Sequence, residues 1–203
     1  MSKSEKILNR KSFFKAEMEK QLPKEQSDLI WEHSLTKLDG ILSQYSDISG
    51  GVRIHTDNFI FPCAAVYLAA KEVIGEEKSY RVIEEASVKR STDMGKKLAK
   101  LMKLPGMPAL FIRIWDPMTR KIFGPDNGFM NIFYPKTKGL FRMDVLECPY
   151  CRYFGELGCP ELTKIFCAND DRIYGNLPGT EFIRKNTLGR GGDKCDFLMK
   201  KRA

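Results

Sequence analysis

The chain has 203 residues, a formal net charge of +8 and a hydrophobic content of 42%. A chain of this length buries roughly 70% of the surface that its unfolded form exposes, so it can form a hydrophobic core. It opens MSKSEKILNRKSFF, without an apolar secretory segment, and its longest nearly apolar run, FIFPCAAVYLAA, is about half of a membrane span. We therefore expect a cytoplasmic protein that makes no membrane contact.

The positive charge raises the question of a nucleic-acid partner. Clustered Lys and Arg would neutralise phosphates, but here acidic residues are interspersed among the basic ones. The sequence also lacks zinc-finger spacing and an aromatic RNA-binding signature. A nucleic-acid adaptor is therefore the last of our hypotheses, and a small anionic molecule fits the same charge.

The first part of the chain, residues 1–124, reads as mainly helical. Apolar residues recur at helical spacing over residues 4–22 and 24–48, with Pro23 between them, and Gly50-Gly51 is expected to end this unit. A third helix is predicted over 56–75, with Pro62 in an early turn. A fourth is predicted from about 79 to 103, ended by the turn LPGMP.

The remaining residues, 125–203, change to strand-like patterns. GFMNIFYP and GLFRMDVLEC are rich in Phe, Ile, Val and Leu and favour an antiparallel hairpin, which the helical segment CPELTKIFCANDDRIYG follows. EFIRKNTLG and KCDFLMK are predicted as two further strands around the turn GRGG. The order β-β-α-β-β behind a helical half predicts one α+β domain over residues 1–203, with an antiparallel sheet and helices on one side of it.

Cys167 and Asp170 are the first candidates for chemistry. They stand three residues apart on the predicted helix, so both side chains lie on one face. A neighbouring carboxylate raises the pKa of a thiol, so Cys167 would need a nearby cation to become a nucleophile. The alternative is a cysteine of the core and an aspartate near a helix end.

Arg184 can supply that cation. In the strand EFIRKNTLG it shares a face with Phe182, so if Phe182 faces the core, Arg184 does too and requires an anionic partner. The partner is either Asp170 or Asp171, or a substrate carboxylate held in a bidentate clamp. Thr187 falls on the opposite face unless the strand ends or bulges. The glycine turn before Asp193 could offer amides to an anion, or serve only as a hairpin turn.

Cys148 and Cys151 form the segment CPYC, and three more cysteines follow them. A zinc site could combine this pair with two later cysteines or with Asp or His, but no second CxxC exists, and His33 and His55 lie far away in the sequence. Redox chemistry has little support because CPYC follows a hairpin and does not head a βαβ helix. We expect reduced thiols beside the candidate site and keep zinc as an alternative.

The C-terminal third resembles the signature of the L-2-amino-thiazoline-4-carboxylic acid hydrolase family, in which a C-x-x-D step precedes R-x-x-T-L and a G-D-x-C-D-F ending. These motifs stand here as Cys167 with Asp170, Arg184 with Thr187 and Leu188, and Gly192, Asp193, Cys195, Asp196 and Phe197. The ending is also similar to 4-vinyl reductase-type ligand-binding domains, whose α+β fold is shared with Golgi transport-particle subunits.

The resemblance implies a hydrolase that breaks a C–N bond in a small cyclic amidine carrying a carboxylate, and opens the thiazoline ring to a carbamoyl-cysteine. We assign Asp170 as base or acid and Cys167 as nucleophile or pocket wall, with Arg184 as carboxylate clamp. Supporting positions in the same pocket are Thr187, Asp193, Cys148 and Cys151. The alternative is a non-catalytic sensory domain that binds a small molecule. Exposed apolar side chains on the first two helices could also support a homodimer.

Overall fold

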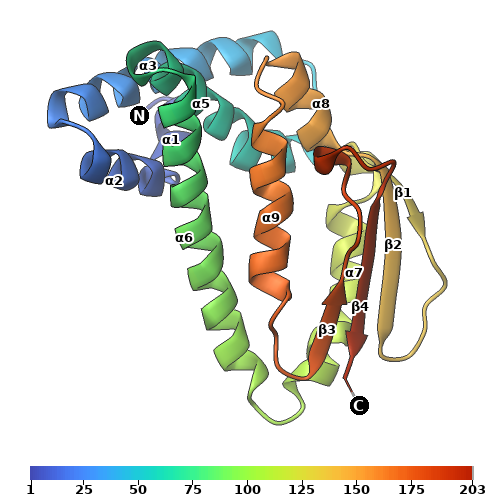
Figure 1. Ribbon diagram of the computed structural model, residues 1–203. Helices are drawn as coiled ribbons and strands as arrows, with labels where there is room; N and C mark the ends of the chain where they lie inside the picture. The colour runs from blue at the N-terminus through green and yellow to red at the C-terminus, as the bar shows by residue number, and fades with distance from the viewer. Residues whose placement is uncertain (203) are drawn as a thin grey trace.

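The computed structural model describes residues 1–202 and combines a helical N-terminal half with a four-stranded antiparallel sheet (Figure 1). The predicted α+β class is therefore confirmed. Among these residues, no helix combines the length and apolar character needed to cross a bilayer.

The N-terminal half is built around one almost wholly buried helix, α5 (Phe61–Ile74). It packs against α3 (Lys24–Gln44) and α6 (Glu76–Met102). The sequence predicts one helix over 4–22, but the structure contains two, α1 (Lys3–Asn9) and α2 (Ser12–Gln21). The break at residues 10–11 leaves Lys11 as the N-cap residue of α2.

Gly50 and Gly51 were expected to end a helical unit, and this prediction is wrong. They begin α4 (Gly50–His55), whose cap is the Ser49 hydroxyl accepting a hydrogen bond from the Val52 amide at 3.4 Å. A Cβ atom on Gly51 would lie 2.2 Å from the carbonyl oxygen of Asp126, so glycine serves close packing here. The chain then runs through one π-helical turn, Thr56–Ile60, directly into α5. Such turns push side chains out of helical register.

Two helices were not foreseen. The first, α7 (Met107–Ile122), follows a turn at Gly106, whose φ of 77° suits glycine, and lies behind the strands in Figure 1. The second, α8 (Pro149–Glu156), begins within CPYC, with Cys148 as its N-cap residue and Pro149 in its first turn. CPYC is therefore the start of a helix.

The sheet has the order β1-β2-β4-β3, with β1 (Met130–Phe133), β2 (Leu140–Glu147), β3 (Thr180–Ile183) and β4 (Cys195–Lys201). Helices α8 and α9 (Leu162–Tyr174) connect β2 to β3. In the pairing of β2 with β4, Met143 lies opposite Phe197 and Val145 opposite Cys195. Helix α7 packs on β2 and β4, and α9 on β3, so the helices cover one face of the sheet.

Two groups of buried side chains result. One fills the helical half, and the other lies between the sheet and α7. The half-buried ring of Tyr150, in α8, packs against both groups. The candidate site lies where these two groups meet.

Candidate functional site

A cavity of about 310 Å³ opens between α6, α7, α9 and the inner face of the sheet. Its walls are mainly apolar and aromatic, with Phe59, Trp115, Phe123, Phe129, Phe166 and Phe197 among them. Its polar lining includes Lys11, Arg90, Tyr150, Cys167, Asp170 and Arg184. A few polar groups on apolar walls are typical of small-molecule sites.

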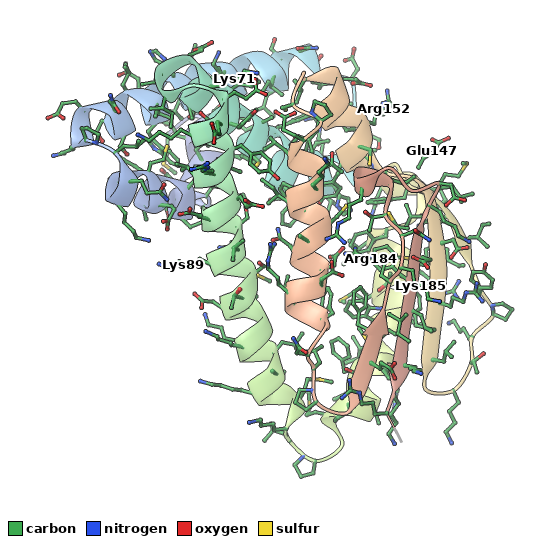
Figure 2. All side chains as sticks on the ribbon, in the orientation of Figure 1. Lys71, Lys89, Glu147, Arg152, Arg184 and Lys185 are labelled. Atoms are coloured by element: carbon green, nitrogen blue, oxygen red, sulfur yellow. The ribbon has the colours of Figure 1, made fainter. Side chains whose placement is uncertain are left out.

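Arg184 lies between α9 and the strands, and its side chain is only 2% exposed (Figure 2). Nη1 donates to Oδ2 of Asp170 at 2.8 Å, and Nη2 lies 2.8 Å from Oδ1 of Asp171. Nη2 also donates to the carbonyl oxygen of Cys167 at 2.6 Å. Of the two roles considered for Arg184, the structure contains the pairing with Asp170 and Asp171.

The carboxyl group of Asp170 has an unusual proton affinity. Burial, with a smaller contribution from the nearby Asp171 carboxylate, raises its pKa to about 6 against the opposing effect of Arg184. The side chain is 35% exposed, and Asp170 is one of the residues that line the cavity. Oδ2 is bound by Arg184, and Oδ1 accepts no hydrogen bond from residues 1–202. Oδ1 is thus open to a ligand or water.

The Cys167 thiol lies on the same face of α9 and lines the same cavity. Burial raises its pKa, and the Asp170 carboxylate adds to the rise, while Thr187 and Arg184 oppose it. The thiol is therefore protonated near neutral pH. The Thr187 hydroxyl is buried without a conventional hydrogen bond, yet it lies close enough to the thiol to lower its pKa.

The segment after β3 is not a continued strand. The strand ends at Ile183, and residues 188–190 form a short 3-10 turn that packs against α9. The Asp196 carboxylate fixes this segment, because its Oδ1 accepts from the amides of Lys185 at 2.9 Å and Asn186 at 2.6 Å. Asp196 belongs to the motif, but its role was not foreseen. Asp193 is exposed and lies outside the cavity lining.

The two cysteines of CPYC differ in position. Cys148 lines the cavity and Cys151 does not. The interaction of the two thiols raises the pKa of Cys148, as burial also does, and lowers the pKa of Cys151. All six cysteines are free thiols. Across residues 1–202, no group of three His, Cys, Asp or Glu side chains is arranged to hold a metal ion.

His55 is far from the motifs in the sequence, but in the fold it contacts Tyr150 of the segment CPYC. Its ring is 2% exposed, with Nε2 at 2.8 Å from the carbonyl oxygen of Ile122 and Nδ1 at 3.2 Å from the Tyr150 hydroxyl. A carbonyl only accepts, so Nε2 carries the proton and Tyr150 donates to Nδ1. Burial lowers the pKa of His55, which favours this neutral ring. The Tyr150 oxygen therefore keeps its lone pairs for a donor in the cavity.

Comparison with known proteins places the chain in a family. The model of the L-2-amino-thiazoline-4-carboxylic acid hydrolase family matches residues 53–199, which is well over half of the chain, so the chain belongs to this family. The matched region contains Cys167, Asp170 and Arg184, and it reaches back into the helical half. No curated protein and no solved structure matches the chain.

Proposed function

We propose that the protein hydrolyses a C–N bond in a small cyclic amidine that carries a carboxylate, of the 2-amino-thiazoline-4-carboxylate type. Family membership supports this reaction class. The observation that carries the proposal is the Asp170 carboxyl, with a pKa of about 6 and a free oxygen in an apolar cavity of about 310 Å³. A group with this proton affinity can both take and return a proton near neutral pH.

The reaction needs one water molecule and one proton carrier. Oδ1 of Asp170 takes a proton from water as the water oxygen bonds to the amidine carbon, and delivers it to the ring nitrogen. Asp170 then moves the hydroxyl proton of the resulting tetrahedral intermediate to the ring nitrogen, and the C–N bond breaks. An amine and a carbonyl group remain, so a thiazoline becomes a carbamoyl-cysteine and Asp170 ends as it began.

Cys167 acts in this scheme as a wall of the cavity. Its raised pKa leaves little thiolate near neutral pH, which favours water as the attacking group. The Tyr150 oxygen, held by His55, accepts a hydrogen bond from the amino group of the amidine. These two assignments give the thiol and the phenol separate functions, packing and orientation.

The experiment is incubation of the purified protein with L-2-amino-thiazoline-4-carboxylate, followed by mass spectrometry. We expect a product that has gained the mass of one water, formed by the wild type and, at a similar rate, by Cys167→Ala. Loss of turnover in a folded Cys167→Ala variant would make the thiol the nucleophile. A ligand that binds unchanged, without ring opening, would instead identify a sensory domain, and binding would then only raise the melting temperature.

A further inference from the structure

The cation predicted to clamp a substrate carboxylate is already neutralised. Arg184 pairs with both Asp170 and Asp171, and Arg190 pairs with the other oxygen of Asp171 at 3.2 Å. Two guanidinium groups thus face two carboxylates. A third carboxylate placed beside Arg184 would be repelled by Asp170 and Asp171. An anionic substrate therefore needs a different cation.

Two other cations line the same cavity, and they come from elements far apart in the sequence. Lys11, at the break between α1 and α2, has Nζ 5.0 Å from the centre of the Phe59 ring. Arg90, on α6, has its guanidinium carbon 4.6 Å from the centre of the Phe13 ring. Lys11 is half-buried and Arg90 is exposed, so Arg90 marks the opening of the cavity.

These two cations lack counter-charges in the part of the chain that the structure describes. Neither Lys11 nor Arg90 forms an ion pair there, whereas Lys3 and Arg53 both pair with Asp57, at 2.8 and 3.5 Å. Burial, together with the nearby guanidinium groups of Arg90 and Arg10, lowers the pKa of Lys11 to about 8. The nearby Cys63 thiol on α5 is protonated, because burial raises its pKa, so it supplies no counter-charge. Uncompensated positive charge beside an apolar cavity favours an anionic ligand.

We propose that Lys11 and Arg90 form the anion-binding end of the cavity and hold the carboxylate of the substrate, while its amidine lies toward Asp170. The choice of an amidine rests on the proposed function; the binding of a small carboxylate does not. Phe13, Phe59 and their neighbours supply flat apolar walls beside the two cations. Arg90 lies inside the family match and Lys11 before it, so the N-terminal helices complete the site.

Calorimetry can test this with two ligands, L-2-amino-thiazoline-4-carboxylate and its carboxamide. Charge-assisted hydrogen bonds are strong enough that Lys11→Gln and Arg90→Gln should each weaken binding of the carboxylate about 10-fold or more. The carboxamide should bind all variants alike. Lys97→Gln, which removes an exposed charge from α6 outside the cavity, is the matched control. Wild-type affinity for the carboxylate in both cavity variants would overturn the proposal.

The pH dependence gives a second readout that a purely structural role would not produce. Lys11 faces Arg10 on its own segment, Arg90 from α6, Cys63 from α5 and the Phe59 ring. Because Lys11 loses its proton near pH 8, binding of the carboxylate should weaken above that pH. Lys11→Arg keeps its charge and should bind undiminished there. The same alkaline loss in Lys11→Arg would contradict the proposal, since Lys11 would then not be its source.

Failure of this inference can be told apart from failure of the proposed function. Wild-type protein that binds the carboxylate through Lys11 and Arg90 but forms no ring-opened product would support the inference and end the hydrolase proposal. Unchanged turnover in Lys11→Gln and Arg90→Gln would support the hydrolase proposal and end the inference that these two cations hold the substrate carboxylate. Melting temperatures of the variants show whether each is folded before its affinity is compared.

Discussion

Nη1 of Arg184 and Oδ2 of Asp170 lie 2.8 Å apart at the wall of an apolar cavity, and this bond leaves the other oxygen of Asp170 free. The buried cation keeps the carboxyl from becoming wholly neutral, while the apolar walls keep its pKa near 6. The balance between these opposing effects is what makes Asp170 suitable for proton transfer.

The first prediction concerns pH. Asp170 must be ionised to take a proton from water, so kcat/KM should rise with pH to a plateau above an apparent pKa of about 6. It should fall again above about pH 8, where Lys11 loses its proton and the substrate carboxylate binds more weakly. The measurement is a pH–rate profile for hydrolysis of the thiazoline. A rate that falls as pH rises through about 6 would mean that the protonated form of Asp170 is needed at the first step.

The second prediction concerns Arg184 as a structural centre. Replacing this buried guanidinium in Arg184→Met leaves Asp170 and Asp171 without their shared partner, and should cost about 3–5 kcal/mol of unfolding free energy. Arg190→Met, at a side chain that is 51% exposed, should cost under about 1 kcal/mol. Urea unfolding of both variants checks this. Equal losses of unfolding free energy in the two variants would show that the buried ion pairs of Arg184 stabilise the fold no more than the exposed pair of Arg190 does.

The third prediction concerns the approach of the 188–190 turn to α9. A Cβ atom on Gly189 would lie 2.7 Å from Cγ2 of Thr163 and 2.8 Å from Sγ of Cys167. Gly189→Ala should therefore push the turn away and lower the unfolding free energy by about 1–3 kcal/mol. Gly40→Ala, which meets open space in α3, is the control and should be slightly stabilising. Unchanged melting of Gly189→Ala would contradict the close contact.

The fourth prediction follows from the unfavourable position of Lys11. Its pKa is about 8 when folded, against 10.5 ordinarily, so the charged form is disfavoured in the native state. The charged side chain therefore lowers the unfolding free energy by a constant amount below pH 8. This loss disappears as pH rises to about 10.5, because Lys11 releases its proton at a lower pH in the folded protein than in the unfolded chain. Lys11→Met should therefore raise the ligand-free melting temperature at neutral pH, and the gain should vanish at alkaline pH. A gain that is equal at both pH values would point to packing alone.

Local patterns predicted much of this molecule. The Phe, Ile, Val and Leu content of residues 128–135 and 139–148 predicted the hairpin of β1 and β2, because β-branched and aromatic side chains favour strands. Helix α7 was missed because it contains Pro108 and Pro117, which obscure the helical spacing of its buried residues Ile112 and Trp115. Helix α8 was missed because its eight residues are too few for a helical period to stand out in the sequence.

The candidate site was predicted only as far as local spacing reaches. The three-residue step from Cys167 to Asp170 placed both on one face of α9, and the alternation around Phe182 indicated that Arg184 turns inward. The contact of His55 with Tyr150 spans 95 residues, and Lys11 comes from the first helical break. No local periodicity encodes such contacts, so they emerge only from the packed fold.

The central claim, that Asp170 carries the proton in hydrolysis, is tested most directly by comparing kcat/KM on L-2-amino-thiazoline-4-carboxylate for wild type, Asp170→Asn and Asp93→Asn. Asparagine keeps the size of the side chain and can still accept from Arg184, but it cannot carry the proton. We predict a loss of about 100-fold or more in folded Asp170→Asn, the range typical of general acid–base groups. Asp93→Asn, an exposed position on α6, should match the wild type. Turnover by Asp170→Asn at the wild-type rate would contradict the account.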